Sequence, residues 1–473
     1  MIKKSTFALF FGNRGFFPGS LMAEARQQVP AVLRKLGHDV LMMDEELTRY
    51  GAVETPLEGE KYANFLKAHR GEYDGVILSL PNFGDETGAV AALQDAGTPI
   101  FIQAYPDEVD KMSPAERRDA FCGKLSIMDV FFQYGVKFTT LKPHVVHPIS
   151  AAFQANINTF DRICQVVKGL RRMTVGAIGA RTTPFKTVRV DEVALQRRGV
   201  TVETLDFSDV IGRVKALSKD SPAFKTKAEV LRNYTSWEGV PGEAFDNLTR
   251  LGVVLDQIVE EYRMDAIAVR CWLELQQQLG ISVCVLMSEM NNRGVSAACE
   301  VDVANAVMMH ALHLASGQPA TLLDWNNNYG DDENRCILFH CGPVPVQLMK
   351  DAGHIEDHAI LANSLGKGCA FGCQVGRISP CDFTFGSLLT DSGRTRVYLG
   401  QGRFTDDPIP SNFFGCAGVA SIDRLQDVLL HIGRNGFRHH VGLTPGLIQA
   451  SLHEALGYYL DYDVSIPQAD GEK

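Results

Sequence analysis

The stretch Phe7-Ala8-Leu9-Phe10-Phe11-Gly12-Asn13-Arg14-Gly15 joins an apolar run to a polar turn bounded by glycines. A short apolar run that ends at turn residues predicts a buried β-strand. Apolar residues with helical spacing follow at residues 21–36, and a second apolar run lies at residues 39–43. Strand, helix and strand in this order predict a βαβ unit and therefore a parallel sheet.

The same alternation continues and is then repeated further along the chain. Strands are expected at 73–80 and 99–102, with a helix at 86–96 between them. The pattern restarts near residue 173, with expected strands at 173–178, 202–205, 265–270 and 295–300 and helices at 189–198, 251–263 and 303–315. Right-handed crossovers would make each half a layered open sheet.

After residue 316 the pattern changes to short strands separated by Gly, Asn, Asp and Pro, which is typical of a barrel or sandwich. These strands are expected at 322–325, 336–340, 371–375, 383–389, 395–399 and 440–443, with a helix at 444–456. The predicted class is therefore α/β, with two open parallel-sheet α/β domains (1–155 and 156–315) and a β-rich, barrel-like C-terminal domain (316–473).

Composition narrows the range of functions. The 473 residues are 45% hydrophobic and 22% charged, as in an ordinary globular protein. Lys and Arg number 46 against 56 Asp and Glu, and the net charge of −10 argues against nucleic acid or an anionic membrane as partner. No apolar run is long enough to span a bilayer. The start of the chain fits a first strand better than a signal peptide, and 11 scattered cysteines favour a reduced, cytoplasmic protein.

Polar residues at the ends of predicted strands are the candidates for chemistry, because ligands of open α/β sheets bind beyond those ends. Glu300, Asp324 and His340 each end an apolar run, and the pair His439-His440 opens a late strand. Carboxylates with imidazoles suit Mn²⁺, with Co²⁺ or Mg²⁺ as alternatives. The competing interpretations are a turn residue for Asp324 and a core histidine for His340. Since neighbours on a strand face opposite sides, only one of the paired histidines should face a given site.

Other signatures of catalysis are missing from the sequence. Gly12-Asn13-Arg14-Gly15 lacks the glycine spacing of a dinucleotide-binding turn, and neither a P-loop nor a G-x-S-x-G motif occurs.

Against this background, the chain resembles the L-fucose isomerase and L-arabinose isomerase superfamily, as a divergent fucose isomerase-like branch. Leu323-Asp324-Trp325-Asn326-Asn327-Asn328-Tyr329 and Ala298-Cys299-Glu300-Val301-Asp302 are similar to its two metal-carboxylate strands, and the spacing (324 − 300 = 24) fits. Phe339-His340-Cys341-Gly342, His439-His440-Val441 and Gly376-Arg377-Ile378-Ser379-Pro380 are similar to later segments. Asp324 stands where arabinose isomerases have Glu, and the chain is shorter than full fucose isomerases.

The resemblance implies an aldose–ketose isomerase that works through a metal-held enediol of an open-chain sugar. Glu300 and Asp324 would ligate the metal and transfer protons, because a proton next to a carbonyl needs both a base and stabilisation of the developing charge. His440 would be the third ligand, with His439 as the alternative. His340 would be an extra ligand or would support the ligands from outside the metal's coordination sphere.

Residues that position the sugar are expected near the same strand ends. An anionic substituent would favour charge-assisted bonds from Arg14, Lys186 or Arg270. Trp272 and Trp325 would provide apolar platforms, and Asn326 and Asn328 would bind hydroxyls. The resemblance also implies a homo-oligomer, trimer or hexamer, with sites between subunits that Arg14 of a neighbouring subunit reaches.

The identity of the sugar stays open between a hexose, a deoxyhexose and a substituted hexose, including a sulfonated one such as sulfoquinovose. Two other functions also stay open. Two α/β domains are compatible with a sugar-binding protein without catalysis, and a degenerate isomerase relative would have a structural role. The carboxylate and histidine set favours the enzyme, since a binding protein has no need of it.

Overall fold

The computed structural model describes residues 3–182 and 184–469. The chain divides into two compact units. The smaller consists of the residues up to 168 together with Glu454–Leu460, and the larger of residues 169–453 with those from 461 on. The second and third predicted domains thus share one unit, and the predicted boundaries themselves stay a prediction.

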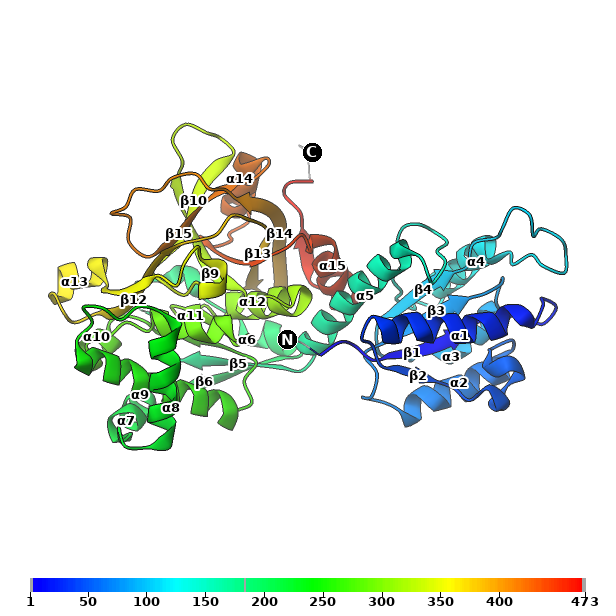
Figure 1. Ribbon diagram of the computed structural model, residues 1–473, viewed down its shortest axis with the longest axis horizontal. Helices are drawn as coiled ribbons and strands as arrows, with labels where there is room; N and C mark the ends of the chain where they lie inside the picture. Colours follow the sequence, from blue (N-terminus) through cyan, green and yellow to red (C-terminus); the bar gives the residue numbers. More distant parts are fainter. Residues whose placement is uncertain (1–2, 183, 470–473) are drawn as a thin grey trace. The chain divides into compact units, whose positions relative to one another are not determined.

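The smaller unit is built on a parallel sheet in the order β2-β1-β3-β4, as the alternation of strands and helices predicts. The strands are β1 (Phe7–Phe11), β2 (Val40–Met42), β3 (Gly75–Leu80) and β4 (Ile100–Ala104). The helices are α1 (Ser20–Lys35), α2 (Pro56–Ala68), α3 (Glu86–Leu93), α4 (Ala120–Gln133) and α5 (Ala151–Leu170) (Figure 1).

Strand β1 shows why this sheet has helices on both faces. Its alternate residues are all apolar and point to opposite sides. Phe7, Leu9 and Phe11 pack with residues of α1 and α5, whereas Ala8 and Phe10 pack with residues of α2, α3 and α4. The chain returns to this unit near its end, where the Tyr459 hydroxyl lies 2.9 Å from that of Thr139.

The larger unit begins with a second parallel sheet, in the order β6-β5-β7-β8. Its strands are β5 (Met173–Ile178), β6 (Val200–Leu205), β7 (Ala266–Val269) and β8 (Ser296–Cys299). The helices of this part are α6 (Glu192–Gln196), α7 (Phe207–Ala216), α8 (Pro222–Tyr234), α9 (Gly242–Glu261), α10 (Glu274–Leu279), α11 (Cys284–Asn292) and α12 (Val303–Ser316).

The third sheet has the order β11-β12-β15-β10-β9-β16-β13-β14-β17, with both parallel and antiparallel pairs. An additional pairing between β14 and β15 closes the strands from β15 to β14 into a barrel, which confirms the barrel-like prediction. The strands are β9 (Thr321–Asn328), β10 (Arg335–His340), β11 (His354–Asp357), β12 (Phe371–Arg377), β13 (Cys381–Asp391), β14 (Arg394–Phe404), β15 (Cys416–Ser421), β16 (His440–Pro445) and β17 (Asp463–Ser465).

Three helices accompany the barrel strands: α13 (Ala359–Leu365), α14 (Leu425–Arg434) and α15 (Gln449–His453). The predicted helix at 444–456 was placed too early. Residues 440–445 pair with β9 and β13 as strand β16, and α15 begins only at Gln449.

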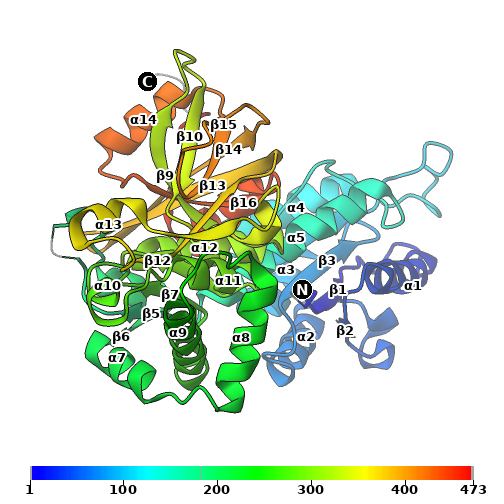
Figure 2. The ribbon, with the colours of Figure 1, turned by 60° about the vertical axis from the view of Figure 1, so that its left-hand side comes forward.

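Helix α12 connects the two sheets of the larger unit. It contacts β7 and β8 of the parallel sheet on one side and β13 and β16 of the barrel on the other (Figure 2). Because α12 follows β8 directly and leads into β9, its position fixes the ends of both strands relative to each other. No helix within the described residues is long and apolar enough to cross a membrane.

Candidate metal centre

Glu300 lies in an unusual backbone segment between β8 and α12. Glu300 and Val301 both have φ = 60°, in the left-handed region that is unfavourable for residues other than glycine. Asp302 then caps α12, with its side chain accepting the backbone N–H of Asn305. Such strain is found mainly where surrounding structure and function require it. Here the turn directs the Glu300 carboxylate toward the barrel strands.

Asp324 and His440 are held together by strand register. They face each other as a cross-strand pair of β9 and β16, so their side chains lie on the same face. Nε2 of His440 lies 3.4 Å from Oδ1 of Asp324 and 2.9 Å from Oε2 of Glu300. The structure therefore brings together the three residues predicted as metal ligands. We call Glu300, Asp324 and His440 the carboxylate–imidazole centre.

The two neighbouring histidines differ as strand alternation predicts. The His440 side chain is 1% exposed and faces both carboxylates, whereas His439 is 42% exposed. Nε2 of His439 lies 3.8 Å from Oδ1 of Asp324, at the edge of the centre. His440 is thus the central imidazole.

Three buried atoms of this centre lack hydrogen-bond partners: Glu300 Oε2, Asp324 Oδ1 and His440 Nε2. Nε2 of His440 and Oε2 of Glu300 lie 2.9 Å apart as an ion-pair contact, and neither atom has a hydrogen-bond partner. Buried polar atoms without partners are costly and rare in folded proteins. Three such atoms that converge are what a metal site requires, so these residues fit a bound divalent cation.

Asp302 fixes the orientation of the His440 ring. The Nδ1 of His440 lies 2.8 Å from Oδ2 of Asp302, which accepts its proton. The neutral ring then has its lone pair on Nε2, which faces Glu300 and Asp324. A carboxylate behind a ligating histidine is the usual outer-shell partner at metal centres. Asp302 is itself fully buried and forms an ion pair with buried Arg438.

The charges around the centre are unbalanced when the histidines are neutral. Glu300, Asp302 and Asp324 are three buried or nearly buried carboxylates, and the Arg438 guanidinium pairs with Asp302. Three negative charges against one positive leave two negative charges in a poorly solvated place. A divalent cation would neutralise them, because buried charges need compensation.

The pKa values show the same excess of negative charge. Burial acts to lower the pKa of His440, but its contacts with Asp302 and Glu300 outweigh burial and raise the pKa to about 10. Burial raises the pKa of Asp324. For Glu300, burial acts upward, but His440 outweighs it and the pKa is lowered. Without a metal, a proton on His440 thus provides part of the missing positive charge.

His340 lies at the end of β10, and its ligand atom is within 4.8 Å of those of Glu300 and His440. The backbone N–H of Cys341 donates to its Nδ1 at 2.9 Å. The neutral ring therefore carries its proton on Nε2, which is buried and without a hydrogen-bond partner. In this tautomer His340 offers a proton donor to the centre, which favours a role as a hydrogen-bonding neighbour over a role as a metal ligand.

A cavity of about 230 Å³ opens beside the centre. Trp272 lies in its wall and donates its indole N–H to Oε1 of Glu300 at 3.2 Å. The lining combines metal-centre residues, thiols and apolar side chains, and it contains no lysine or arginine. It consists of Cys271, Trp272, Ser282, Cys284, Glu300, Asp324, Phe339, His340, Cys341, His358, Ile360, Leu361 and Phe414.

The predicted cationic residues are placed elsewhere. Arg14 belongs to the smaller unit, where it pairs with Glu86 and donates to the Gly84 carbonyl at 2.8 Å. Arg270 follows β7 but its guanidinium is held by Glu274, with one bond of 2.6 Å. Lys186 is exposed, in a short 3₁₀ turn, and is not part of the cavity lining.

The residues that follow Asp324 also point away from the cavity. Trp325 donates its N–H to the Tyr398 hydroxyl at 3.1 Å and packs against Phe385, in the barrel core. Strand alternation explains this, since adjacent residues face opposite sides. Asn326 and Asn328 are exposed and bond to Asn327 and Gly330. Of the predicted sugar-positioning residues, only Trp272 lines the cavity.

Sequence reasoning missed Arg438 and Phe185 and did not assign Asp302 to the centre. Phe185 packs its ring against Trp272, His439 and His440, with centroid distances between 5.5 and 5.9 Å. Asp302 follows a strand end and lies within the segment that resembles a metal-carboxylate strand, but it was given no role of its own; it caps α12 and also contacts His440. Arg438 directly precedes the histidine pair, a basic neighbour that nothing else in the sequence marked.

Comparison with known proteins gives two family matches. Residues 8–171 match the N-terminal domain of fucose/sulfoquinovose isomerases, and residues 338–467 match the C-terminal domain of L-fucose isomerases. A sulfoquinovose isomerase of Alkalicoccus urumqiensis is 23% identical, over 65% of this chain and 68% of its own. A sulfoquinovose isomerase of Priestia aryabhattai is 20% identical, over 86% of this chain and 89% of its own.

Solved structures give a weaker likeness. A periplasmic sugar-binding protein of a Legionella pneumophila sugar transporter covers 67% of this chain and 97% of its own, at 11% identity and a TM-score of 0.18. A solute-binding protein of Agrobacterium vitis bound with α-D-tagatopyranose covers 66% and 90%, at 11% identity and a TM-score of 0.18. Scores this low carry no argument about function. The family is shown instead by the two family matches, which lie at both ends of the chain, and by the relatives that span most of it. The chain therefore belongs to the fucose isomerase-like family, as a divergent member.

Proposed function

We propose that this protein is a metal-dependent isomerase that converts an open-chain sulfonated aldohexose into its ketose through an enediol. Membership of the family makes it an aldose–ketose isomerase acting on a sugar. The metal, the mechanism and the substrate are our proposal. One observation carries it: buried Glu300 Oε2, Asp324 Oδ1 and His440 Nε2 converge without hydrogen-bond partners.

The carboxylate–imidazole centre would hold the cation through Glu300, Asp324 and His440. We propose Mn²⁺, with Co²⁺ or Mg²⁺ as alternatives, since two carboxylates and one imidazole suit this class. The bound cation would supply Lewis-acid stabilisation of the negative charge that develops on the sugar's adjacent oxygens. Asp302 would keep His440 in the ligating tautomer, through the 2.8 Å bond to Nδ1.

Proton transfer between C2 and C1 would fall to the two carboxylates. Glu300 and Asp324 both reach the cavity, so either can contact the substrate. A positioned carboxylate can take the proton next to the carbonyl and return it to the neighbouring carbon. The Nε2–H of His340 would donate to a substrate oxygen, and Trp272 would hold Glu300 in place through its N–H.

A sulfonated hexose is proposed because both named relatives are sulfoquinovose isomerases. The cavity lining has no lysine or arginine of its own to bind a sulfonate. A homo-oligomer, trimer or hexamer, in which a neighbouring subunit supplies Arg14 would provide one. Replacing Arg14 with Ala should then raise KM for the sulfonated sugar more than for a neutral one, and size-exclusion light scattering would measure the assembly.

A sugar panel with metal analysis tests the proposal. Ketose formation is measured from sulfoquinovose, glucose, L-fucose and L-arabinose, with protein that is chelated, or chelated and reloaded with Mn²⁺. We expect turnover of sulfoquinovose that needs the metal and that Glu300→Gln and Asp324→Asn abolish while the protein stays folded. Chelated protein that isomerises as fast as reloaded protein would refute metal dependence.

The same panel separates the enzyme from a sugar-binding protein. A binding protein would hold a sugar tightly in calorimetry and release it unchanged, with or without metal. The carboxylate–imidazole centre argues against this function, because binding a neutral sugar does not require two unpartnered carboxylates around one imidazole.

A further inference from the structure

Thiols from four different elements gather on one side of His340. Cys271 follows β7, Cys284 begins α11, Cys299 ends β8 and Cys341 follows β10. The sulfurs of Cys284 and Cys341 are 3.5 Å apart, and those of Cys271 and Cys299 lie within 4.8 Å of each other. The proposed isomerase chemistry uses none of these thiols.

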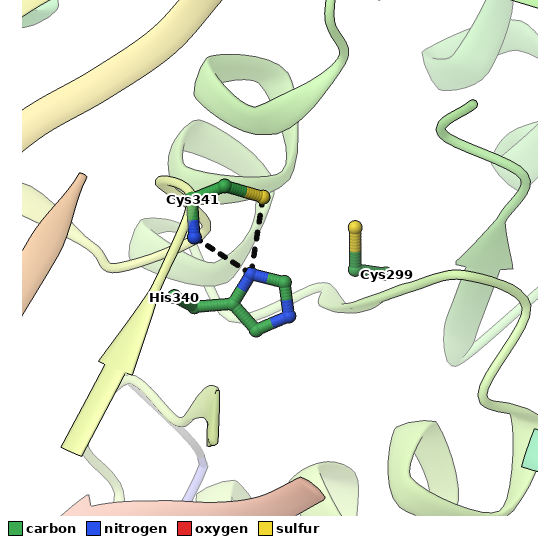
Figure 3. Close-up of side chains that lie close together, drawn as sticks. All are labelled: Cys299, His340 and Cys341. Atoms are coloured by element: carbon green, nitrogen blue, oxygen red, sulfur yellow. Dashed lines mark hydrogen bonds between the residues drawn. The ribbon is translucent and has the colours of Figure 1, made fainter. Parts of the chain in front are cut away.

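Two of the thiols and the His340 ring form the tightest part of this group. The ligand atoms of Cys299, His340 and Cys341 all lie within 4.8 Å of one another. Figure 3 shows the His340 ring beside both cysteine side chains, with Nδ1 turned toward Cys341. Nδ1 lies 3.2 Å from the Cys341 sulfur. All three residues are buried or half-buried.

The tautomer of His340 gives the ring a lone pair on the thiol side. Nδ1 accepts the backbone N–H of Cys341, so it carries no proton in the neutral ring. A cation that bound Nδ1 would replace that contact. Imidazole nitrogen with thiolate sulfur is a set that thiophilic cations such as Zn²⁺ prefer, whereas Mn²⁺ and Mg²⁺ prefer oxygen ligands.

The dimensions also fit a cation. Zinc binds sulfur at about 2.3 Å and nitrogen at about 2.0 Å, so ligand atoms of one ion lie roughly 3.5 Å apart. The 3.2 Å separation of Nδ1 and the Cys341 sulfur is close to this, and the Cys299 sulfur lies within 4.8 Å of the other two ligand atoms. His340 and Cys341 both line the cavity, which gives an ion a path and leaves room for a water as a further ligand.

We propose that Cys299, Cys341 and Nδ1 of His340 form a second metal site, for one thiophilic divalent cation of the zinc and cadmium class. Each thiol releases its proton to solvent as it binds. The site adjoins the carboxylate–imidazole centre but shares no residue with it, and ligand chemistry determines which class of metal binds at each. Its existence does not depend on the proposed isomerase reaction.

Cadmium titration of the full-length, metal-free protein tests this site, with a phosphine reductant that keeps the thiols reduced. We expect an ultraviolet absorbance from thiolate-to-cadmium charge transfer that corresponds to one thiolate-bound cadmium ion per chain. Cys341→Ser and Cys299→Ser should each remove this absorbance and weaken binding by about tenfold or more. Cys336→Ser is the matched control, since Cys336 is also buried and lies on β10 but belongs to none of the metal-binding groups among the described residues.

Other variants keep the outcome decisive. If Cys341→Ser fails to fold by circular dichroism, Cys299→Ser carries the test. Glu300→Gln should keep the thiolate absorbance, because Glu300 is not one of the three proposed ligands. The proposal is overturned if the unmodified protein shows no thiolate absorbance, if the two cysteine variants keep it, or if Cys336→Ser or Glu300→Gln loses it.

Discussion

At the scale of single residues, Asp302 combines a structural and a chemical role. Its Oδ1 accepts the N–H of Asn305 at 3.2 Å and so caps α12. Its Oδ2 accepts the Nδ1 proton of His440 at 2.8 Å, and the carboxylate is paired with Arg438. The same side chain thus begins the helix, orients the imidazole and compensates a buried guanidinium.

Asp302→Asn separates these roles, because Asn caps helices as well as Asp does. We expect Mn²⁺ affinity to fall about 10- to 100-fold, since the neutral amide supports the His440 ring less well. We also expect a loss of about 3 kcal/mol of unfolding free energy, because Arg438 stays buried without its partner. Calorimetric Mn²⁺ titration and urea unfolding measure the two effects.

The control for Asp302→Asn is Asp206→Asn, the same change at the exposed N-cap of α7. It should leave the Mn²⁺ affinity and the unfolding free energy unchanged within error. Equal losses at both positions would mean that Asp302 acts only as a cap.

His310 gives a prediction about acid stability. It lies buried on α12, its Nδ1 has no hydrogen-bond partner, and burial lowers its pKa to about 3. An unfolded histidine has a pKa of about 6.5, so below that pH the unfolded chain binds more protons than the folded one. Stability is therefore lost as pH falls from about 6.5 toward 3, by roughly 3 kcal/mol at about pH 4.5.

The variant His310→Gln should lose correspondingly less stability than the unmodified protein between neutral and acid pH. Urea unfolding at the two pH values measures the difference. His453→Gln, at an exposed histidine, is the control and should follow the unmodified protein. Parallel losses in all three proteins would rule out a contribution from His310.

The residues of the metal centre show what a sequence can and cannot predict. Glu300 and Asp324 were found because each ends an apolar run, and strand ends are where ligands bind. Strand alternation predicted that only one histidine of the pair faces the site, and the resemblance favoured His440. The structure places His440 inward. The same rule turns Trp325 into the barrel core, but the sequence did not show which face of β9 met the cavity.

At the scale of elements, α12 is held close to the barrel by a pair of glycines. Gly386 on β13 and Gly442 on β16 face each other in register. A Cβ on Gly442 would lie 3.1 Å from Leu312 of α12, and one on Gly386 would lie 3.0 Å from Met308 and 2.9 Å from the Tyr398 carbonyl. The close approach of α12 therefore depends on two positions without side chains.

Gly386→Ala should destabilise the larger unit by about 1–3 kcal/mol, because the new methyl group meets backbone that cannot easily move. Urea unfolding measures the change. Gly433→Ala is the matched control on α14: its Cβ meets nothing within 4 Å, and it is exposed in the last turn of the helix. It should stabilise by about 0.4–1 kcal/mol, because Ala restricts the unfolded chain more than Gly does. If the unfolding free energy changed in the same direction in both variants, this account of α12 packing would be contradicted.

How well a strand could be predicted depended on its amino-acid composition. Strands rich in large apolar residues, such as β1 and β10, were predicted close to their observed bounds. Strand β15 was missed because Cys416–Ser421 consists mostly of small residues that look like a loop. Its strand conformation is imposed by its neighbours β10, β12 and β14. Tertiary pairing of this kind leaves no periodic signal in one sequence.

At the scale of the whole molecule, the order of the chain does not coincide with its compact units. Both α/β patterns and the β-rich C-terminal pattern were visible in sequence. The return of Glu454–Leu460 to the smaller unit could not be predicted, because the sequence of a short segment does not indicate which distant part of the chain it packs against. All residues of the carboxylate–imidazole centre belong to the larger unit, which allows metal binding to be tested unit by unit.

Metal binding should stabilise the larger unit selectively. A ligand that binds only the folded state adds about 3 kcal/mol of unfolding free energy at 100 times its Kd. We therefore expect Mn²⁺ to raise the unfolding temperature of this unit and to increase hydrogen-exchange protection in β9, β16 and α12. Strands β1, β3 and β4 of the smaller unit should be unaffected. Calorimetry with exchange mass spectrometry measures both effects, and Glu300→Gln should abolish them. An equal response in that variant, or protection that rises in both units alike, would place the bound ion outside the carboxylate–imidazole centre.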